Sequence, residues 1–255
     1  MDKKYFFDDI TLLITHYNRS NSLERLLKEF KTLSCTFREI IVSDDCSNPE
    51  HAARLNELSS IYGFRLVGTP VNRGLANNIN KGQDEVQTPF TLYIQEDFIP
   101  KEMFPEKLRL AVQYMNERLD FDMVRFYAYF DYPYLKPYKG GFSEMIFKRF
   151  TAEYKKFYYY SDHPHLRRQN FTQKFGRYIE GIKSDRAEYR MMFSFIRAGG
   201  KALFYTDYKG LFDQKNDAEE PSTIKRNFLR ENNNFLMIGI RNIYRLVRFN
   251  FDLFK

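Results

Sequence analysis

The stretch FTLYIQEDFIP, residues 90–100, joins an apolar run to two adjacent carboxylates. Its aromatic and β-branched residues favour a mostly covered strand, and the closing proline cannot join a strand ladder. Glu96 and Asp97 therefore stand at the carboxyl end of a predicted strand, where open α/β sheets bind their ligands. A solvated turn is the alternative for one such pair taken alone.

Strand and helix patterns alternate through the first hundred residues. Short apolar runs predict strands at residues 10–17, 38–45, 64–69 and 89–97, and helical periodicity predicts helices at residues 21–30, 49–63 and 74–86. Asn21 or Ser22 is the expected N-cap of the first helix. Strands separated by helices of this length imply right-handed crossovers. The expected fold class is therefore α/β, with a mostly parallel sheet flanked by helices.

The second predicted strand also ends on carboxylates, Asp44 and Asp45. In a parallel sheet both acidic pairs reach the same edge, so four carboxylates meet near one crevice. Their mutual repulsion requires a cation or donor groups nearby. A divalent metal and a nucleotide would supply both.

Composition limits the class of protein. The 255 residues are enough for one large domain or one domain with an appendage, and 43% hydrophobic with 29% charged residues describes a soluble globular protein. Two cysteines are too few for a disulfide framework, which favours the reducing cytoplasm. We expect no signal peptide and no spanning helix. The net charge of +7 favours an anionic partner.

Four fragments in this order, LLITHYNRSNSLERLL, EIIVSDDCSNPE, VNRGLANNINKG and YIQEDF, resemble the nucleotide-sugar-binding half of GT-A fold glycosyltransferases of family 2, a group of inverting bacterial enzymes. The resemblance covers residues 9–100 and, more loosely, 175–215. It implies a Rossmann-like GT-A domain at residues 1–220. Residues 1–100 would form its nucleotide-sugar-binding half and residues 101–220 its acceptor-binding half.

The resemblance also implies a set of nucleotide-sugar-binding residues: Thr15, Tyr17, Asn18, Arg19, Asp44, Asp45, Arg73, Asn80, Glu96 and Asp97. Tyr17 matches the residue that stacks on the base, and Asp44 the aspartate that accepts a hydrogen bond from it. Asp45 is placed near the ribose and Arg73 near the phosphates. A guanidinium and a donor-rich helix start suit a diphosphate on physical grounds as well.

The triplet QED, residues 95–97, occupies the position of the family's metal motif. The resemblance implies that Asp97 holds Mg²⁺ or Mn²⁺ and that Glu96 is the second acid, while Gln95 replaces a carboxylate of many relatives. In GLFDQKN, residues 210–216, many relatives carry a histidine that completes the metal shell, so Gln214 or Asp213 is the expected substitute. Hard oxygen ligands suit these ions.

The segment DRAEYRMMFSFIRAGGKALFY, residues 185–205, resembles the family's acidic helix start with the helix, glycine and strand that follow. Glu188 matches its glutamate, but Tyr189 replaces the aspartate that usually serves as base. Glu188 is therefore the implied base for the acceptor hydroxyl, with Asp185 second and Glu180 third. A helix-start anion without a catalytic role is the alternative.

Aromatic and basic residues interleave between residues 101 and 175, which suits an acceptor platform because flat rings stack against sugars. Nucleic acid uses the same chemistry, but acidic strand ends repel phosphate unless a metal intervenes, so we expect no nucleic-acid partner. His163 and His165 lack a third ligand at a metal-site spacing. His165 is expected to line the donor pocket or pack beneath it.

The segment 221–255 is expected to be a basic, amphipathic helical extension. From residue 222 onward it carries seven Lys and Arg against Glu231 and Asp252. Helical spacing groups apolar Ile240, Ile243, Tyr244, Val247 and Phe251, and a separate stripe holds Arg241, Arg245 and Arg248. Such a helix can lie on an anionic membrane or pack on the catalytic domain, and both alternatives stay open.

The sequence therefore predicts a metal-dependent inverting glycosyltransferase that moves a sugar from a nucleotide-diphosphate sugar to a glycan or lipid-linked acceptor. Surface polysaccharide or lipopolysaccharide synthesis, in the cytoplasm or at the inner face of a membrane, is the expected setting. A nucleotide-sugar-binding protein without transferase activity and a basic, aromatic nucleic-acid-binding protein are the alternatives. The sugar, the nucleotide and the acceptor stay open.

Overall fold

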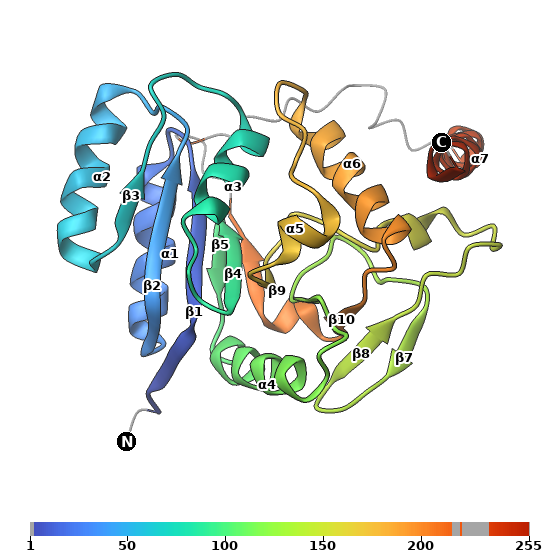
Figure 1. Ribbon diagram of the computed structural model, residues 1–255, viewed down its shortest axis with the longest axis horizontal. Helices are drawn as coiled ribbons and strands as arrows, with labels where there is room; N and C mark the ends of the chain where they lie inside the picture. The colour runs from blue at the N-terminus through green and yellow to red at the C-terminus, as the bar shows by residue number, and fades with distance from the viewer. Residues whose placement is uncertain (1–2, 216–219, 221–234, 255) are drawn as a thin grey trace.

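A mixed sheet runs through the molecule, with helices on both of its faces (Figure 1). The computed structural model describes residues 3–215, 220 and 235–254. Within them the nine-stranded sheet has the order β3-β2-β1-β4-β9-β6-β10-β8-β7. Its strands are β1 (Tyr5–His16), β2 (Cys35–Asp44), β3 (Arg65–Val67), β4 (Phe90–Gln95), β6 (Met123–Arg125), β7 (Leu135–Pro137), β8 (Phe142–Met145), β9 (His165–Arg168) and β10 (Ala202–Tyr205).

The helices are α1 (Ser20–Thr32), α2 (Pro49–Tyr62), α3 (Leu75–Asp84), α4 (Phe104–Glu117), α5 (Phe171–Phe175), α6 (Ser184–Arg197) and α7 (Phe235–Phe254), with 3₁₀ turns η1 (Tyr154–Phe157) and η2 (Tyr208–Gly210). Alternation along the central strand builds a core on each side of the sheet. Leu12 and Ile14 of β1 pack in the core that α1, α2 and α4 cover, and Leu13 packs in the core under α3 and α6. Successive side chains of a strand point to opposite faces, so one apolar run serves both cores.

The predicted parallel strands are confirmed. β1 pairs in parallel with β2 and with β4, and β2 pairs in parallel with β3. The register places His16 opposite Asp44 and Thr15 opposite Gln95. Both acidic strand ends therefore lie at one edge of the sheet, as the sequence predicted.

Strand β9 interrupts the parallel order in a way that the sequence did not predict. It runs antiparallel between β4 and β6, and His165 lies opposite both Tyr93 and Arg125. Because β9 runs in the opposite direction, the segment that precedes it lies at the edge where β4 ends. Residues 161–164 are thereby brought to this edge of the sheet, where the His163 ring lies 6.1 Å from the Phe98 ring.

A separate two-stranded sheet pairs β5 (Phe98–Pro100) with β11 (Phe212–Gln214). The strands are antiparallel, and Phe98 lies opposite Gln214. This pairing brings residues 212–214 next to the strand that directly follows the QED triplet.

The expected N-cap of the first helix was wrong. α1 begins at Ser20, and its cap residue Arg19 makes no capping hydrogen bond through its side chain. Instead the carboxylate of Glu220 accepts hydrogen bonds from the backbone N–H groups of Asn21 and Ser22 at 2.8 and 2.9 Å. A distant anion thus satisfies the free amides and the dipole of this helix start.

The predicted helix at the C-terminus is confirmed as α7, which packs on the rest of the chain. The Phe249 ring lies 5.2 Å from the Phe157 ring and 5.1 Å from the Tyr189 ring, and Leu253 is buried. The expected boundary at residue 221 lies outside the described residues, so the division into domains stays a prediction. Over the described part of the chain, no helix combines the length and apolarity needed to cross a bilayer.

Candidate active site

Glu96 and Asp97 lie just beyond β4 and are nearly buried, at 9% and 5% exposure. The guanidinium of Arg19 lies 3.3 Å from a Glu96 carboxylate oxygen and 3.7 Å from one of Asp97. Burial, and next the charge of Asp97, raises the pKa of Glu96 to about 7. The pair therefore favours a further positive charge or a shared proton.

Gln214 approaches Asp97 through the pairing of β5 with β11. Its side-chain Nε2 donates to Asp97 Oδ2 at 2.9 Å, and its Oε1 accepts from the Tyr129 hydroxyl at 3.1 Å. Asp213, the other residue considered for this position, instead pairs with Lys101 at 2.7 Å and is exposed. The structure thus brings Gln214, and not Asp213, to the acidic pair.

The donor set at this point fits a hard divalent cation. Asp97 Oδ1 is buried and has no hydrogen-bond partner among the described residues. Across the same residues, no group of three or more His, Cys, Asp or Glu side chains forms a cage for a metal. Mg²⁺ and Mn²⁺ do not need such a cage, since they keep waters and bind phosphate oxygens of a nucleotide. Asp97 and Glu96 would hold the ion, whereas Gln214, the other ligand expected from the sequence, turns its amide nitrogen toward Asp97 and its amide oxygen toward Tyr129.

The second acidic strand end is engaged within the protein. Ser47 Oγ and His16 lie 2.6 and 2.8 Å from Asp44 Oδ1, and the Ser47 backbone N–H donates to Oδ2. Burial acts to raise the Asp44 pKa, but the hydrogen bonds from His16 and Ser47 hold it below its ordinary value. Asp45 accepts from the backbone N–H groups of Arg73 and Gly74 at 2.8 and 2.7 Å. Both aspartates therefore shape the loops at this edge.

The predicted residues after β1 lie at the same edge. Thr15 is buried, and its hydroxyl lies 3.1 Å from the Tyr93 hydroxyl. Tyr17 is partly exposed just beyond the strand. Asn18 has a φ of 53°, a left-handed conformation that asparagine tolerates, and its side chain accepts from the Asn48 backbone at 2.8 Å. The turn is thus held in place with Tyr17 at its surface.

Arg73 and Asn80 meet at Glu180. Arg73 lies 3.4 Å from a Glu180 carboxylate oxygen, and the Asn80 side chain donates to the other at 3.0 Å. Asn77 also donates to Glu180, at 2.7 Å. These contacts, the Asn80 hydrogen bond first, lower the pKa of Glu180. A carboxylate that is held as an anion by three donors is a poor base, which weakens the case for Glu180 as the catalytic group.

The candidate bases on α6 differ in their surroundings. Asp185 is exposed in the first helical turn. Glu188 is partly buried, and its Oε1 accepts from the backbone N–H of Asp162 at 2.9 Å. Burial, and next the charge of Asp162, raises the pKa of Glu188 to about 7. Such a pKa suits a base that works near neutral pH.

Asp162 was missed in the sequence, where it lies within an unremarkable SDHPH segment. It is 5% exposed, and its carboxylate accepts from the hydroxyls of Tyr178 and Tyr160 at 2.6 and 3.0 Å. No local pattern marks it, because its partners come from other parts of the chain. Glu220 was missed for the same reason.

The two histidines pack against aromatic rings, and the predicted place of His165, in the donor pocket or beneath it, stays a prediction. The His165 ring lies 5.3 Å from the Tyr93 ring, and burial holds its pKa well below the ordinary value. The His163 ring lies 4.4 Å edge-on from the Tyr129 ring, and burial lowers its pKa to about 3. Both rings are therefore neutral at physiological pH. Tyr129, 60% exposed beside Gln214, supplies a ring face next to the acidic pair.

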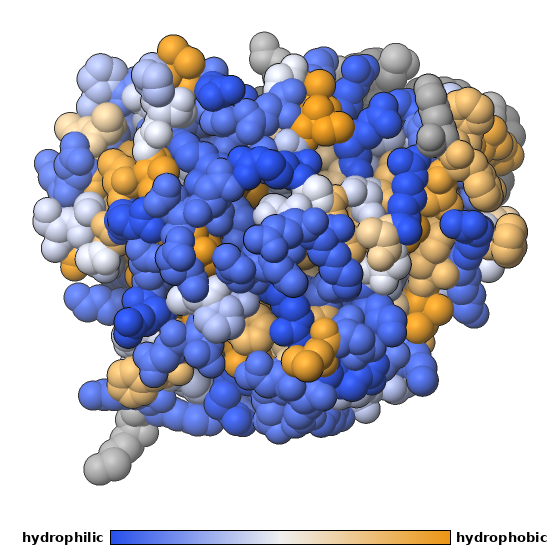
Figure 2. All heavy atoms as spheres, in the orientation of Figure 1, coloured by the Kyte–Doolittle hydropathy of each residue, from blue (hydrophilic) through white to orange (hydrophobic). Residues whose placement is uncertain are grey.

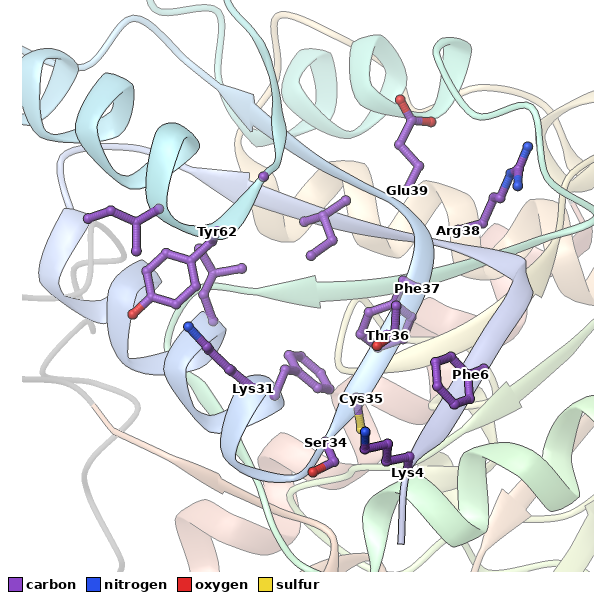
Figure 3. Close-up of a pocket in the computed structure, with 15 residues that line it drawn as sticks. Lys4, Phe6, Lys31, Ser34, Cys35, Thr36, Phe37, Arg38, Glu39 and Tyr62 are labelled. Atoms are coloured by element: carbon purple, nitrogen blue, oxygen red, sulfur yellow. The ribbon is translucent and has the colours of Figure 1, made fainter. Parts of the chain in front are cut away.

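A groove of about 520 Å³ lies at the opposite end of the sheet (Figure 3). The starts of β1 and β2 and the last turns of α1 and α2 line it, with Lys4, Lys31 and Cys35 among its residues. None of the predicted site residues that the structure describes lines this groove. The acidic edge, and not this groove, is therefore the candidate active site.

Comparison with known proteins gives a family and a fold. The model of the family described as glycosyl transferase family 2 matches residues 11–176, more than half of the chain. The poly-beta-1,6-N-acetyl-D-glucosamine synthases of Staphylococcus epidermidis and of Staphylococcus aureus strain MSSA476 are 27% and 28% identical over 92 residues. That match spans 36% of this chain and 22% of the length of each relative.

Two solved structures share the fold at low identity. Staphylococcus aureus TarS 1-349, in complex with UDP-GlcNAc, has a TM-score of 0.63 at 14% identity. The match covers 96% of this chain and 73% of the TarS chain. The mannosyltransferase PcManGT of Pyrobaculum calidifontis, in complex with GDP-Man and Mn²⁺, has a TM-score of 0.55 at 12% identity. The match covers 78% of this chain and 55% of the PcManGT chain. The expected GT-A fold is confirmed.

Proposed function

The chain belongs to glycosyl transferase family 2, and from this we propose that it is a metal-dependent inverting glycosyltransferase. One observation carries the proposal: a buried acidic pair lies at the carboxyl edge of the parallel strands β1, β2 and β4. Gln214 lies beside it, and Asp97 Oδ1 has no hydrogen-bond partner within the part of the chain that the structure describes. Ligands of open α/β sheets bind at this edge. The arrangement matches what a metal-bound diphosphate requires.

The proposed donor is a nucleotide-diphosphate sugar. The titles of the two similar structures name UDP-GlcNAc and GDP-Man, which supports this donor class without choosing a nucleotide. Tyr17 would stack on the base, Arg73 would face the phosphates, and Asp97 would hold Mg²⁺ or Mn²⁺. A bound divalent ion would stabilise negative charge on the diphosphate.

The proposed chemistry is a single displacement. Glu188 takes the proton of the acceptor hydroxyl as its oxygen bonds to the anomeric carbon. The bond from that carbon to the diphosphate oxygen breaks, and its electron pair leaves with the diphosphate. Because attack and departure use opposite faces, the configuration inverts. The raised pKa of Glu188 matches the role of a base near neutral pH.

The proposed acceptor is a glycan or a lipid-linked sugar, and the product belongs to surface polysaccharide or lipopolysaccharide. The poly-beta-1,6-N-acetyl-D-glucosamine synthases support a polysaccharide product. Tyr129 offers its ring to the acceptor, since sugar rings stack on aromatic faces.

The C-terminal helix supports a peripheral place on the cytoplasmic face of a membrane. While Phe249 and Leu253 pack inward, five outward side chains of α7 are 59% to 67% exposed: Ile243, Tyr244, Val247, Phe251 and Phe254. The guanidinium of Arg149 lies 5.3 Å from the Phe254 ring, and the neighbouring Phe150 is 93% exposed. Figure 2 shows apolar residues gathered on the side where Figure 1 places α7. Arginines beside exposed apolar groups suit an anionic lipid surface.

A thermal-shift titration tests the donor proposal. The purified chain is titrated with UDP, GDP and dTDP and their sugars, each with Mn²⁺, with Mg²⁺ and with EDTA. One nucleotide should stabilise the fold in a metal-dependent way, and its sugar should be hydrolysed slowly or transferred. Nucleotide binding without hydrolysis or transfer of any tested donor sugar would favour a nucleotide-sugar-binding protein instead. No stabilisation by any nucleotide would reject the donor site.

A further inference from the structure

A continuous set of hydrogen bonds joins the candidate donor site to the candidate base. The Asn80 side chain donates to the Tyr178 carbonyl at 2.9 Å and accepts from the Tyr178 N–H at 3.0 Å. The Tyr178 hydroxyl donates to Asp162 Oδ1 at 2.6 Å. The Asp162 N–H in turn donates to Glu188 Oε1 at 2.9 Å. Four residues from three distant parts of the chain thus form one connected unit.

Asp162 is the centre of this unit because of the direction of β9. The antiparallel strand starts at the edge where β4 ends, so the residues before it lie among the site residues. A buried carboxylate is costly unless donors surround it, and two tyrosine hydroxyls converge on a single Asp162 oxygen. The hydroxyls of Tyr160 and Tyr178 also contact each other. Asp162 is therefore fixed in place.

We propose that Asp162 is a positioning residue for sugar transfer, holding the Glu188 carboxylate through its backbone N–H and keeping it able to accept a proton through its own buried charge. The inference rests on the proposed function, since it gives Glu188 the role of base. Asp162 does not touch the reacting atoms in this scheme. It acts through Glu188.

The charges around the two carboxylates support this role. Glu188 faces the Asp162 carboxylate, Ser161 and, from β6, the Arg125 guanidinium. Burial and next the charge of Asp162 raise the pKa of Glu188 to about 7, while the Asp162 backbone N–H, Arg125 and Ser161 act to lower it. Asp162 faces the two tyrosine hydroxyls and Arg167 of β9, all of which lower its pKa, but burial dominates and raises it to about 6. Asp162 is buried and Glu188 is partly buried, so the two neighbouring carboxylates repel each other and each holds a proton more tightly. Removing one charge must therefore lower the pKa of the other.

The test of this proposal replaces one carboxylate oxygen of Asp162 with an amide nitrogen. Asp162→Asn keeps the side-chain shape and the backbone N–H to Glu188 but removes the charge. The Glu188 carboxyl is followed by carbon-13 NMR titration of the full chain, and its signal is assigned with Glu188→Gln. We expect the Glu188 pKa to fall by about one unit or more, which corresponds to about 1.4 kcal/mol or more of lost repulsion. The acid limb of the kcat/KM profile should move to lower pH by the same amount, with the KM for the donor little changed.

Two further variants separate a charge effect from damage to the fold. Tyr178→Phe removes a hydroxyl that stabilises ionised Asp162, so Asp162 should bind its proton more tightly and the Glu188 pKa should fall by less than in Asp162→Asn. Asp122→Asn alters another buried aspartate, whose partners are Lys174 and the Lys201 backbone, and should leave the Glu188 titration unchanged.

The outcomes distinguish the two proposals. An unchanged Glu188 titration in folded Asp162→Asn overturns the inference, even if the wild type transfers sugar. A lowered Glu188 pKa in a protein that transfers no sugar establishes the coupling and rejects the transferase. A lowered pKa together with a shifted acid limb supports both.

Discussion

Gln214 donates a hydrogen bond to Asp97 at 2.9 Å across 117 residues of chain. The backbone reinforces the contact, since the Lys215 N–H donates to the Asp97 carbonyl at 2.8 Å. The amide is directed at one carboxylate oxygen, while the other oxygen stays buried without a partner among the described residues. Asp97 is therefore oriented by the protein, and its two oxygens differ in their surroundings.

Asp97→Asn should remove metal-dependent nucleotide binding, because the amide has lost the charge that a divalent ion requires. At a hundredfold excess over its dissociation constant, a nucleotide stabilises the wild type by about 2.7 kcal/mol. With Mn²⁺ we expect most of this gain to vanish in the variant, as measured by thermal shift. Asp213→Asn is the matched control, since Asp213 pairs with Lys101 at the surface. Equal Mn²⁺-dependent stabilisation in both variants would contradict the metal role.

Glu220→Ala should destabilise the start of α1. The variant leaves the N–H groups of Asn21 and Ser22, and the Ser22 hydroxyl at 2.6 Å, without their acceptor. Loss of a helix cap costs about 1 to 2 kcal/mol, which urea unfolding would detect. Glu57→Ala, an exposed helical glutamate paired with Arg54, should change stability by less than about 0.5 kcal/mol. Equal midpoints of urea unfolding for Glu220→Ala and Glu57→Ala would show that Glu220 does not cap the helix in solution.

Gly82→Ala should weaken the contact between α3 and the sheet. A Cβ at this position would lie 2.5 Å from Leu13 Cδ1 and 3.0 Å from Ser43 Cβ, so the helix would have to shift. Overpacking of this kind costs about 1 to 3 kcal/mol, partly offset by the better helix propensity of alanine. At Gly68 a Cβ meets no atom within 4 Å, so Gly68→Ala should be tolerated. Urea unfolding of both variants would show whether the close approach is real.

Lowering the pH should stabilise the ligand-free protein through Glu188. Its pKa is about 7 in the folded chain against an ordinary value of 4.5, so the folded state binds its proton more tightly than the unfolded state does. The contribution of Glu188 to the free energy of unfolding is therefore greatest below pH 4.5 and falls as the pH rises toward 7. Glu188→Gln should flatten this fall between pH 5 and 7.5 in thermal unfolding. An equally steep fall in the variant would mean that Glu188 ionises normally.

The exposed face of α7 should bind anionic vesicles. Val247→Glu and Phe251→Glu place negative charge on that face, and Phe150→Glu does so on the neighbouring loop. Each should lower cosedimentation with phosphatidylglycerol vesicles by roughly tenfold, because apolar burial and charge attraction are both lost. Leu119→Glu, at a residue 76% exposed outside this face, is the control. Vesicle binding that is unchanged in all of these variants would reject a lipid surface. Variants that lose self-association while vesicle binding stays the same would also reject it.

Local sequence determined the framework of this fold. Apolar runs and helical periodicity located four strands and the helices between them, since both signals depend only on neighbouring residues. Parallel order then followed from the helical crossovers, and with it the meeting of Asp44 and Asp97 at one edge. The family resemblance added Gln214 as a candidate metal ligand and Glu188 as the candidate base.

Tertiary structure decided which polar groups meet. The antiparallel course of β9 places Asp162 beside Glu188, and Glu220 reaches a helix start some 200 residues earlier in the chain. Neither contact can be predicted from local sequence, because the residues around a carboxylate do not indicate whether it is solvated or buried against a distant partner. The sequence thus determined the elements and their acidic edge by itself, whereas long-range packing decided the ionisation and the orientation of the carboxylates there.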